Sequence, residues 1–215
     1  VHKRGGAWYY FVPLLLIGIL PWLGLLLQSL VASLRKENTR FQTKKMLFIW
    51  VTFIFFFFSI SGSKLPSYIL PIFPALAILI ACQLEQISIF SLRLNAALML
   101  IIGAVSLALT PKIAGMAKHA YEIPFYAAMV PWAYVAAGLA FIGGLSALVF
   151  AKRNKDLSVI ALACCTFLAG QALFLGHDTW GKYNAGVYHL DAIKAELTPE
   201  TPIFSVGRYE QALPF

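Results

Sequence analysis

The residues with the clearest chemical potential lie in a short polar segment between two apolar runs, residues 61–71, SGSKLPSYILP. At a membrane edge the Lys64 ammonium would be a point-charge ligand for a phosphate, and the Tyr68 hydroxyl could donate a hydrogen bond to the same group. Alternatively, Lys64 extends to the membrane surface and Tyr68 belongs to a belt of interfacial aromatic residues. Spacing alone favours this second interpretation, because such residues are common at interfaces.

A second basic segment opens the chain and leads into an aromatic run, HKRGGAWYY. His2, Lys3 and Arg4 could help to hold an anionic headgroup or a sugar phosphate. An ordinary juxtamembrane anchor has the same composition and is the commoner explanation for such a segment.

Residues suited to acid–base or metal chemistry are sparse in this sequence. Glu85 follows an apolar run and reads as a solvated end, while Glu122, with Lys118 and His119, is a weak candidate for a polar site. The sequence contains no HExxH, phosphate-loop, GxSxG or dinucleotide-binding motif. We therefore predict groups that bind an anion, with no catalytic residue, no metal site and no cofactor within this chain.

The composition places these groups in a membrane protein. Of the 215 residues, 60% are hydrophobic and 12% are charged, and the mean hydropathy is +0.77. Soluble domains have about 45–50% apolar residues and about 25% charged ones. The net charge of +8 is typical of topology-determining loops and does not indicate a nucleic-acid partner. The three cysteines lie in apolar stretches without zinc or disulfide spacing.

The apolar runs predict an all-α polytopic protein with about six transmembrane helices, since each span needs about 20 apolar residues. Residues 1–176 form the predicted membrane region. The expected spans cover residues 9–34, 46–61, 69–83, 94–110, 124–150 and 157–176.

Lysine and arginine in short connections predict the orientation. The connection between the first two spans holds Arg35, Lys36 and Lys44, and that between the last two holds Lys152 and Arg153. If every span crosses, both connections lie on one side, which the positive-inside rule assigns to the cytoplasm. The Lys64 segment and the C-terminal tail then lie on the outer side.

The tail, residues 177–215, differs in composition from the rest. Apolar residues recur at three- and four-residue steps between residues 187 and 197, which indicates an amphipathic helix, and residues 203–206 read as a short strand. We therefore expect the start of a small α/β domain outside the membrane. Because the chain begins at Val1 and stops soon after this strand, we expect it to be part of a longer protein.

Several of these motifs resemble the bacterial lipid A aminoarabinose transferases and the wider protein-mannosyltransferase-like GT-C glycosyltransferases. The segment SGSKLPSYILPIFPALAIL is similar to the K-L-P-x-Y-x-x-P pattern of these enzymes, with Lys64, Pro66, Tyr68 and Pro71 at the matching positions. The aromatic opening WYYFVPLLLIGILPW and the tail VGRYEQALPF support the same resemblance.

The resemblance implies a bundle of about a dozen helices with a periplasmic C-terminal domain, of which this chain would supply the second half. Such enzymes transfer a sugar from a polyprenyl-phosphate carrier to lipid A, another glycan or a protein at the periplasmic face of the bacterial inner membrane. Their key acid lies in an N-terminal periplasmic loop, which we expect to be missing here. Lys64 and Tyr68 are then candidates for contact with the carrier-lipid phosphate, and His2, Lys3 and Arg4 are looser ones. The implied partners are the lipid-linked donor, the acceptor and membrane lipids.

Two other classes of function fit the same composition, namely a small transporter or lipid flippase and a non-catalytic membrane scaffold. Few charged residues lie inside the predicted spans, whereas transport pathways usually contain them, and this argues against a transporter.

Overall fold

The computed structural model describes residues 6–38, 40–184 and 198. Its order is α1 (Phe11–Gly18), α2 (Leu23–Ser33), α3 (Thr43–Ile60), the 3-10 helix η1 (Pro66–Ile69), α4 (Ile72–Leu84) and α5 (Ile89–Leu109). Two further 3-10 helices, η2 (Thr110–Met116) and η3 (Ala120–Glu122), then lead into α6 (Ile123–Phe150) and α7 (Lys155–Asn184). Within this part of the chain there is no strand.

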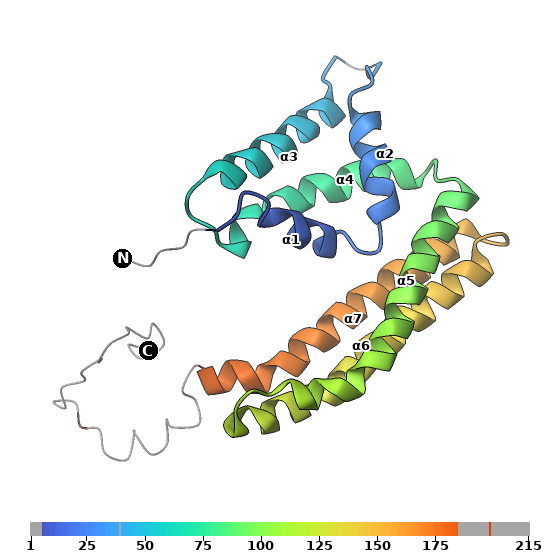
Figure 1. Cartoon of the computed structure of the whole chain (residues 1–215). Coiled ribbons are helices and arrows are strands. Elements are labelled where there is room, and N and C mark those ends of the chain that lie inside the picture. Colours follow the sequence, from blue (N-terminus) through green and yellow to red (C-terminus); the bar gives the residue numbers. More distant parts are fainter. Residues whose placement is uncertain (1–5, 39, 185–197, 199–215) are drawn as a thin grey trace.

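The helices form two groups that follow one another along the chain (Figure 1). Helices α1–α4 enclose a core of large side chains, among them Phe11, Leu25, Ile72 and Leu76, each at most 1% exposed. Helices α5, α6 and α7 are longer and run side by side, and their buried residues are mostly small, such as Ala96 and Ala140.

Four helical stretches are long and apolar enough to cross a membrane, namely Thr43–Ile60, Ile89–Met116, Ala120–Phe150 and Lys155–Lys182. Helices α1 and α2 would make a fifth span if counted together, but they are bent by 102°. Pro21 lies between them, and proline has no N–H with which to continue a helix. The prediction of one regular span over residues 9–34 is therefore corrected to a broken one.

The short span predicted over residues 69–83 corresponds to α4, Ile72–Leu84. Helix α4 has 13 residues and is about 20 Å long, whereas the hydrocarbon core of a bilayer is about 30 Å thick. Pro71 and the preceding 3-10 helix delay its start. The described residues thus give four or five candidate spans instead of about six. The amphipathic helix and the strand expected in the tail lie outside the described residues.

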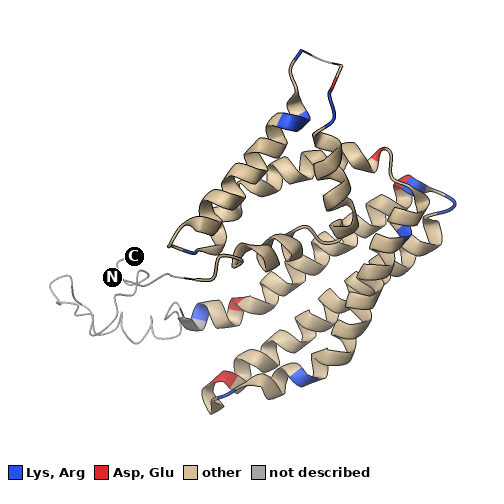
Figure 2. Ribbon diagram, turned by 45° about the horizontal axis from the view of Figure 1, so that its top comes forward, with Lys and Arg blue, Asp and Glu red and all other residues tan. Residues whose placement is uncertain are grey.

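The most basic connections lie together at one end of the helices. The connections that follow α2, α4 and α6 lie at one end of the helices, and the connection from α3 to η1 lies at the other (Figures 1 and 2). Lys155 Nζ donates a hydrogen bond of 2.7 Å to the Ile87 carbonyl, which joins two of these connections. We call this end, with the connections 34–42, 85–88 and 151–154, the basic end.

Candidate functional site

The candidate site lies where α3 ends. The helix stops at Ile60, and Ser61 leaves it with an extended ψ of 140°. Leu65 is also extended, at φ −130° and ψ 138°, and Pro66 then opens η1. The chain thereby turns back on the end of α3 and brings Lys64 and Tyr68 beside the residues that close that helix.

Lys64 turns inward, although the sequence allowed an anchor that extends to the membrane surface. Its residue surface is only 7% exposed, and Nζ donates hydrogen bonds to the carbonyls of Phe58, at 2.8 Å, and Ser59, at 2.6 Å. These carbonyls belong to the last turn of α3, where helix geometry leaves them without an amide partner and where the helix dipole favours a cation. Nζ also lies 5.5 Å from the centre of the Phe11 ring.

This arrangement leaves part of the ammonium group unused. An ammonium carries three N–H donors, and the two carbonyls occupy two of them. No acidic side chain pairs with Lys64 within the described ranges. Lys64 is therefore a buried cation with one N–H donor that these two carbonyls do not use.

Tyr68 lies close to Lys64 through the residue that both of them contact. Its ring stacks on Phe58, with ring centres 4.8 Å apart and an angle of 28° between the planes. The side chain is half-buried, and across the described part of the chain its hydroxyl has no hydrogen-bond partner. The stacking fixes the ring and leaves the hydroxyl available as a donor.

Ser59 is a member of this group that the sequence analysis missed. It is 6% exposed, its carbonyl accepts from Lys64, and its buried hydroxyl has no hydrogen-bond partner among the described residues. Unsatisfied buried hydroxyls are rare, so this one marks an unusual position. The available signal was a serine that ends a run of four phenylalanines just before the polar segment.

The N-terminal segment reaches the same place. A Cβ atom on Gly6 would lie only 3.0 Å from Lys64 Cγ, so glycine lets the backbone pass directly over the lysine stem. The looser candidates His2, Lys3 and Arg4 lie outside the described residues. The structure thus places Gly6, from the N-terminal candidate segment, against the Lys64 loop, residues 61–65.

The remaining polar candidates lie elsewhere and serve local structure. The Glu122 carboxylate accepts hydrogen bonds from the backbone amides of Lys118, at 2.7 Å, and His119, at 3.2 Å, and so closes its own 3-10 turn. Glu85 is exposed at the end of α4. Among the described residues no group of three His, Cys, Asp or Glu could hold a metal ion. Within the described residues, the Lys64 group (Ser59, Lys64 and Tyr68) offers an ammonium and two hydroxyls and contains no carboxylate or imidazole.

Comparison with known proteins shows which family uses this arrangement of helices. No family model matches the chain. The undecaprenyl phosphate-α-4-amino-4-deoxy-L-arabinose arabinosyl transferase of Enterobacter sp. (strain 638) is 37% identical over 171 residues, which are 76% of this chain and 29% of that protein. The corresponding transferase of Edwardsiella ictaluri is 34% identical over 188 residues, or 80% of this chain and 32% of that protein.

A solved structure extends the match over almost the whole chain. The crystal structure of ArnT from Cupriavidus metallidurans bound to undecaprenyl phosphate superposes with a TM-score of 0.86 at 34% identity. It covers 99% of this chain and 39% of that protein, and the apo structure gives a TM-score of 0.87. The chain belongs to the ArnT family of undecaprenyl phosphate aminoarabinose transferases. It spans about a third of the length of these ArnT relatives.

Family membership confirms the resemblance seen in the sequence and makes the chain a multi-pass membrane protein. The ArnT relatives are bacterial arabinosyl transferases named for undecaprenyl phosphate, and one of them holds this lipid in its crystal structure.

Proposed function

We propose that this chain forms the part of a membrane glycosyltransferase that binds the phosphate of a polyprenyl-phosphate sugar donor. The whole enzyme would transfer the sugar to lipid A, another glycan or a protein at the periplasmic face. In this proposal the Lys64 end and the C-terminal tail are periplasmic, and the basic end is cytoplasmic, in keeping with the positive-inside rule.

The observation that carries the proposal is the state of Lys64 in a chain whose 34%-identical structural relative binds undecaprenyl phosphate. Lys64 is 7% exposed, holds two carbonyls and retains a third donor. Because the carbonyls fix the ammonium in place, no rearrangement is needed when a phosphate arrives. A preorganised cation also stabilises the charge that develops on a phosphate leaving group as the glycosidic bond breaks.

The isoprenoid tail of such a donor needs an apolar surface next to the phosphate-binding residues. Helix α3, which ends at the Lys64 loop, exposes Trp50, Phe53 and Phe57 along its length, and the last two rings stack with centres 5.8 Å apart. We propose that this aromatic face of α3 contacts the isoprenoid chain while Lys64 and Tyr68 contact its phosphate.

Binding of undecaprenyl phosphate to the chain in nanodiscs of zwitterionic lipid tests this proposal. Replacing Lys64 with Met should weaken binding on the order of tenfold to a hundredfold, because a hydrogen bond to a charged group contributes roughly 1.5–3 kcal/mol. Tyr68→Phe keeps the stacked ring and removes the hydroxyl, and it should weaken binding about fivefold.

Lys112→Met is the matched control, since Lys112 is an exposed lysine in η2, away from the Lys64 loop. Undecaprenol, which lacks the phosphate, should bind the parent chain and the Lys64 variant equally. If Lys64→Met and Tyr68→Phe both fold and bind undecaprenyl phosphate as tightly as the parent, the proposal is wrong.

Catalysis by the chain alone is a separate expectation. The resemblance places the key acid of the family in a loop near the N-terminus of the full enzymes, and the chain spans about a third of its relatives. We therefore expect the isolated chain to bind the donor without transferring its sugar. Turnover above background with a polyprenyl-phosphate sugar would contradict this expectation.

A further inference from the structure

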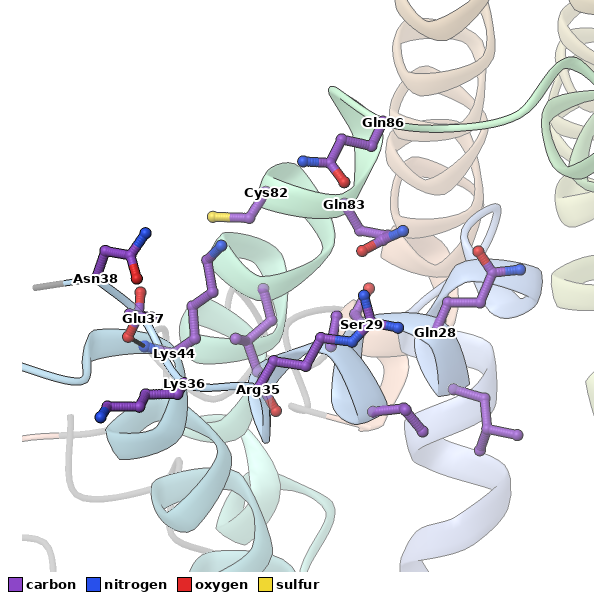
Figure 3. A pocket seen from close by; sticks show the side chains of 15 residues that line it. Gln28, Ser29, Arg35, Lys36, Glu37, Asn38, Lys44, Cys82, Gln83 and Gln86 are labelled. Carbon is purple, nitrogen blue, oxygen red and sulfur yellow. Dashed lines mark hydrogen bonds between the residues drawn. The ribbon is translucent and has the colours of Figure 1, made fainter.

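A cavity lies at the basic end, at the opposite end of α3 from Lys64. It has a volume of about 740 Å³ and lies between the end of α2, the start of α3 and the end of α4 (Figure 3). Leu27, Val31 and Leu79 form apolar wall, and amide side chains such as Gln83 and Gln86 stand beside it. A cavity with one apolar wall and one polar rim can hold an amphipathic ligand.

The charges around this cavity are unbalanced. Its lining includes three cations, Arg35, Lys36 and Lys44, and a single carboxylate, Glu37. In Figure 3 the side chains of Lys44 and Arg35 extend over the cavity, toward Cys82 and Ser29 respectively, while Lys36 extends away from both. No ion pair involves these cations within the residues that the structure describes.

The carboxylate and two serine hydroxyls of the lining are hydrogen-bonded to backbone groups. The Glu37 carboxylate accepts the backbone amide of Lys44 at 3.0 Å. The hydroxyls of Ser29 and Ser33 donate to the carbonyls of Leu25 and Leu30 in their own helix, at 2.8 and 2.6 Å. The three cations of the lining outnumber its single carboxylate, and the glutamine amides can donate as well as accept hydrogen bonds, so the lining can hold an anion.

The start of α3 adds to this positive charge. Its first turn contains Lys44 and no acidic residue, and its N-cap, Gln42, makes no side-chain capping bond. A helix N-terminus carries partial positive charge, and the Glu37 carboxylate offsets part of it here by accepting the Lys44 backbone amide. The positive-inside rule explains basic residues in this connection, but it does not explain why two of them extend over a cavity.

We infer that this cavity binds the headgroup phosphate of an anionic phospholipid from the adjoining leaflet, with Arg35 and Lys44 contacting the phosphate and the α2–α4 wall contacting the acyl chains. The site is independent of the proposed donor site, because it lies at the opposite end of α3 and takes a different lipid.

Cys82 provides a reporter inside the cavity. It lines the cavity and is half-exposed, whereas Cys164 is exposed on α7 and does not line it. In nanodiscs, N-ethylmaleimide labelling of both thiols is measured by peptide mass spectrometry as phosphatidylglycerol replaces phosphatidylcholine. We expect phosphatidylglycerol to slow labelling of Cys82 several-fold and to leave Cys164 unchanged. Equal labelling of Cys82 in the two lipids would overturn the inference.

A charge-matched pair of variants separates the cavity from general surface attraction. Arg35→Gln/Lys44→Gln removes two charges at the cavity, and Lys152→Gln/Arg153→Gln removes two exposed charges at the same end. The cavity variant should lose about 30-fold in affinity for short-chain phosphatidylglycerol in neutral detergent, because it loses both proposed contacts to the phosphate. The control variant should stay within about threefold of the parent.

Equal losses in the two variants, or no loss in either, would overturn the inference, provided that both unfold at the temperature of the parent. Inorganic phosphate is the remaining probe. If it displaces phosphatidylglycerol at similar concentrations, the cavity takes free phosphate and the lipid assignment is wrong.

Discussion

The two halves of the chain, α1–α4 and α5–α7, fill their cores with side chains of different size. Helices α1–α4 pack large residues such as Phe11 and Leu76, and two of their helices have only 8 and 11 residues. Helices α5–α7 pack mainly alanine and glycine, and they have 21, 28 and 30 residues. Small residues let helix backbones approach closely, so long helices can stay straight and paired. Large residues hold helices further apart and accommodate breaks between them.

The breaks explain where polar side chains are buried. Every helix end inside a membrane leaves amides or carbonyls without partners, and lipid cannot supply any. In the first half Lys64 meets the carbonyls that end α3, and Gly24 near the start of α2 donates to Asn95 Oδ1 of α5 at 2.9 Å. In the second half, hydroxyls such as that of Ser146 bond carbonyls of their own helix. The candidate site thus arises in the half whose helices are interrupted.

Disrupting the close packing of α6 against α5 should have the largest effect on stability. A Cβ on Gly144 would lie 2.4 Å from the Leu100 backbone nitrogen, and backbone cannot rotate away. Gly144→Leu should lower the free energy of unfolding by about 3 kcal/mol or more, through overpacking between α5 and α6. Gly138→Leu is the matched control, because no atom lies within 4 Å of a Cβ there. Thermal unfolding in detergent measures both, and an equally stable Gly144 variant would refute the close-packing account.

Removing the lysine that ends α3 should have the next largest effect. Lys64→Met leaves the Phe58 and Ser59 carbonyls without a donor, and the expected loss is about 2 kcal/mol. Lys112→Met, at an exposed position, should change stability by less than about 0.5 kcal/mol. Denaturant unfolding followed by circular dichroism compares the two. Equal stabilities would mean that Lys64 does not hold the end of α3.

The cap of α2 should contribute somewhat less. Asn95 is 1% exposed, and Asn95→Ala leaves the Gly24 amide without its acceptor, at an expected cost of about 1–2 kcal/mol. Ser146→Ala should cost less than about 0.5 kcal/mol, because its hydroxyl bonds only carbonyls that already belong to a continuous helix. Hydrogen exchange at the Gly24 amide gives a local measurement. Unchanged protection in Asn95→Ala would show that another group caps α2.

Much of the helical layout could be predicted from apolar runs. The predicted segments 46–61 and 124–150 agree closely with Thr43–Ile60 and Ile123–Phe150. Pro21 carried the signal for the break between α1 and α2, since proline interrupts helices, but an apolar run alone does not show it. The length of a run also could not show that α4 begins only at Ile72.

The candidate site was only partly predictable. Lys64 and Tyr68 stood out because they are polar residues between apolar runs, and the structure brings them both to Phe58. The carbonyl partners of Lys64 and the orphan hydroxyl of Ser59 depend on how the loop folds back on α3, which residue types do not reveal. The role of Asn95 depends on a contact between residues 71 positions apart. Whether Lys64 and Tyr68 contact a phosphate stays a prediction.

The bond between Gly24 and Asn95 also fixes the register of the two halves. Gly24 has no side chain, and a Cβ there would lie 3.0 Å from Asn95 Oδ1. The Asn95 side-chain amide therefore occupies the space that a side chain at position 24 would need. Sliding α5 by one helical turn, about 5.4 Å, would bring Met99 or Ser91 to Gly24 in place of the amide. Methionine offers only a weak acceptor and serine has a shorter side chain, so either shifted alignment would lose the hydrogen bond to the Gly24 amide. A smooth apolar interface would allow such sliding, and this single polar contact selects one alignment.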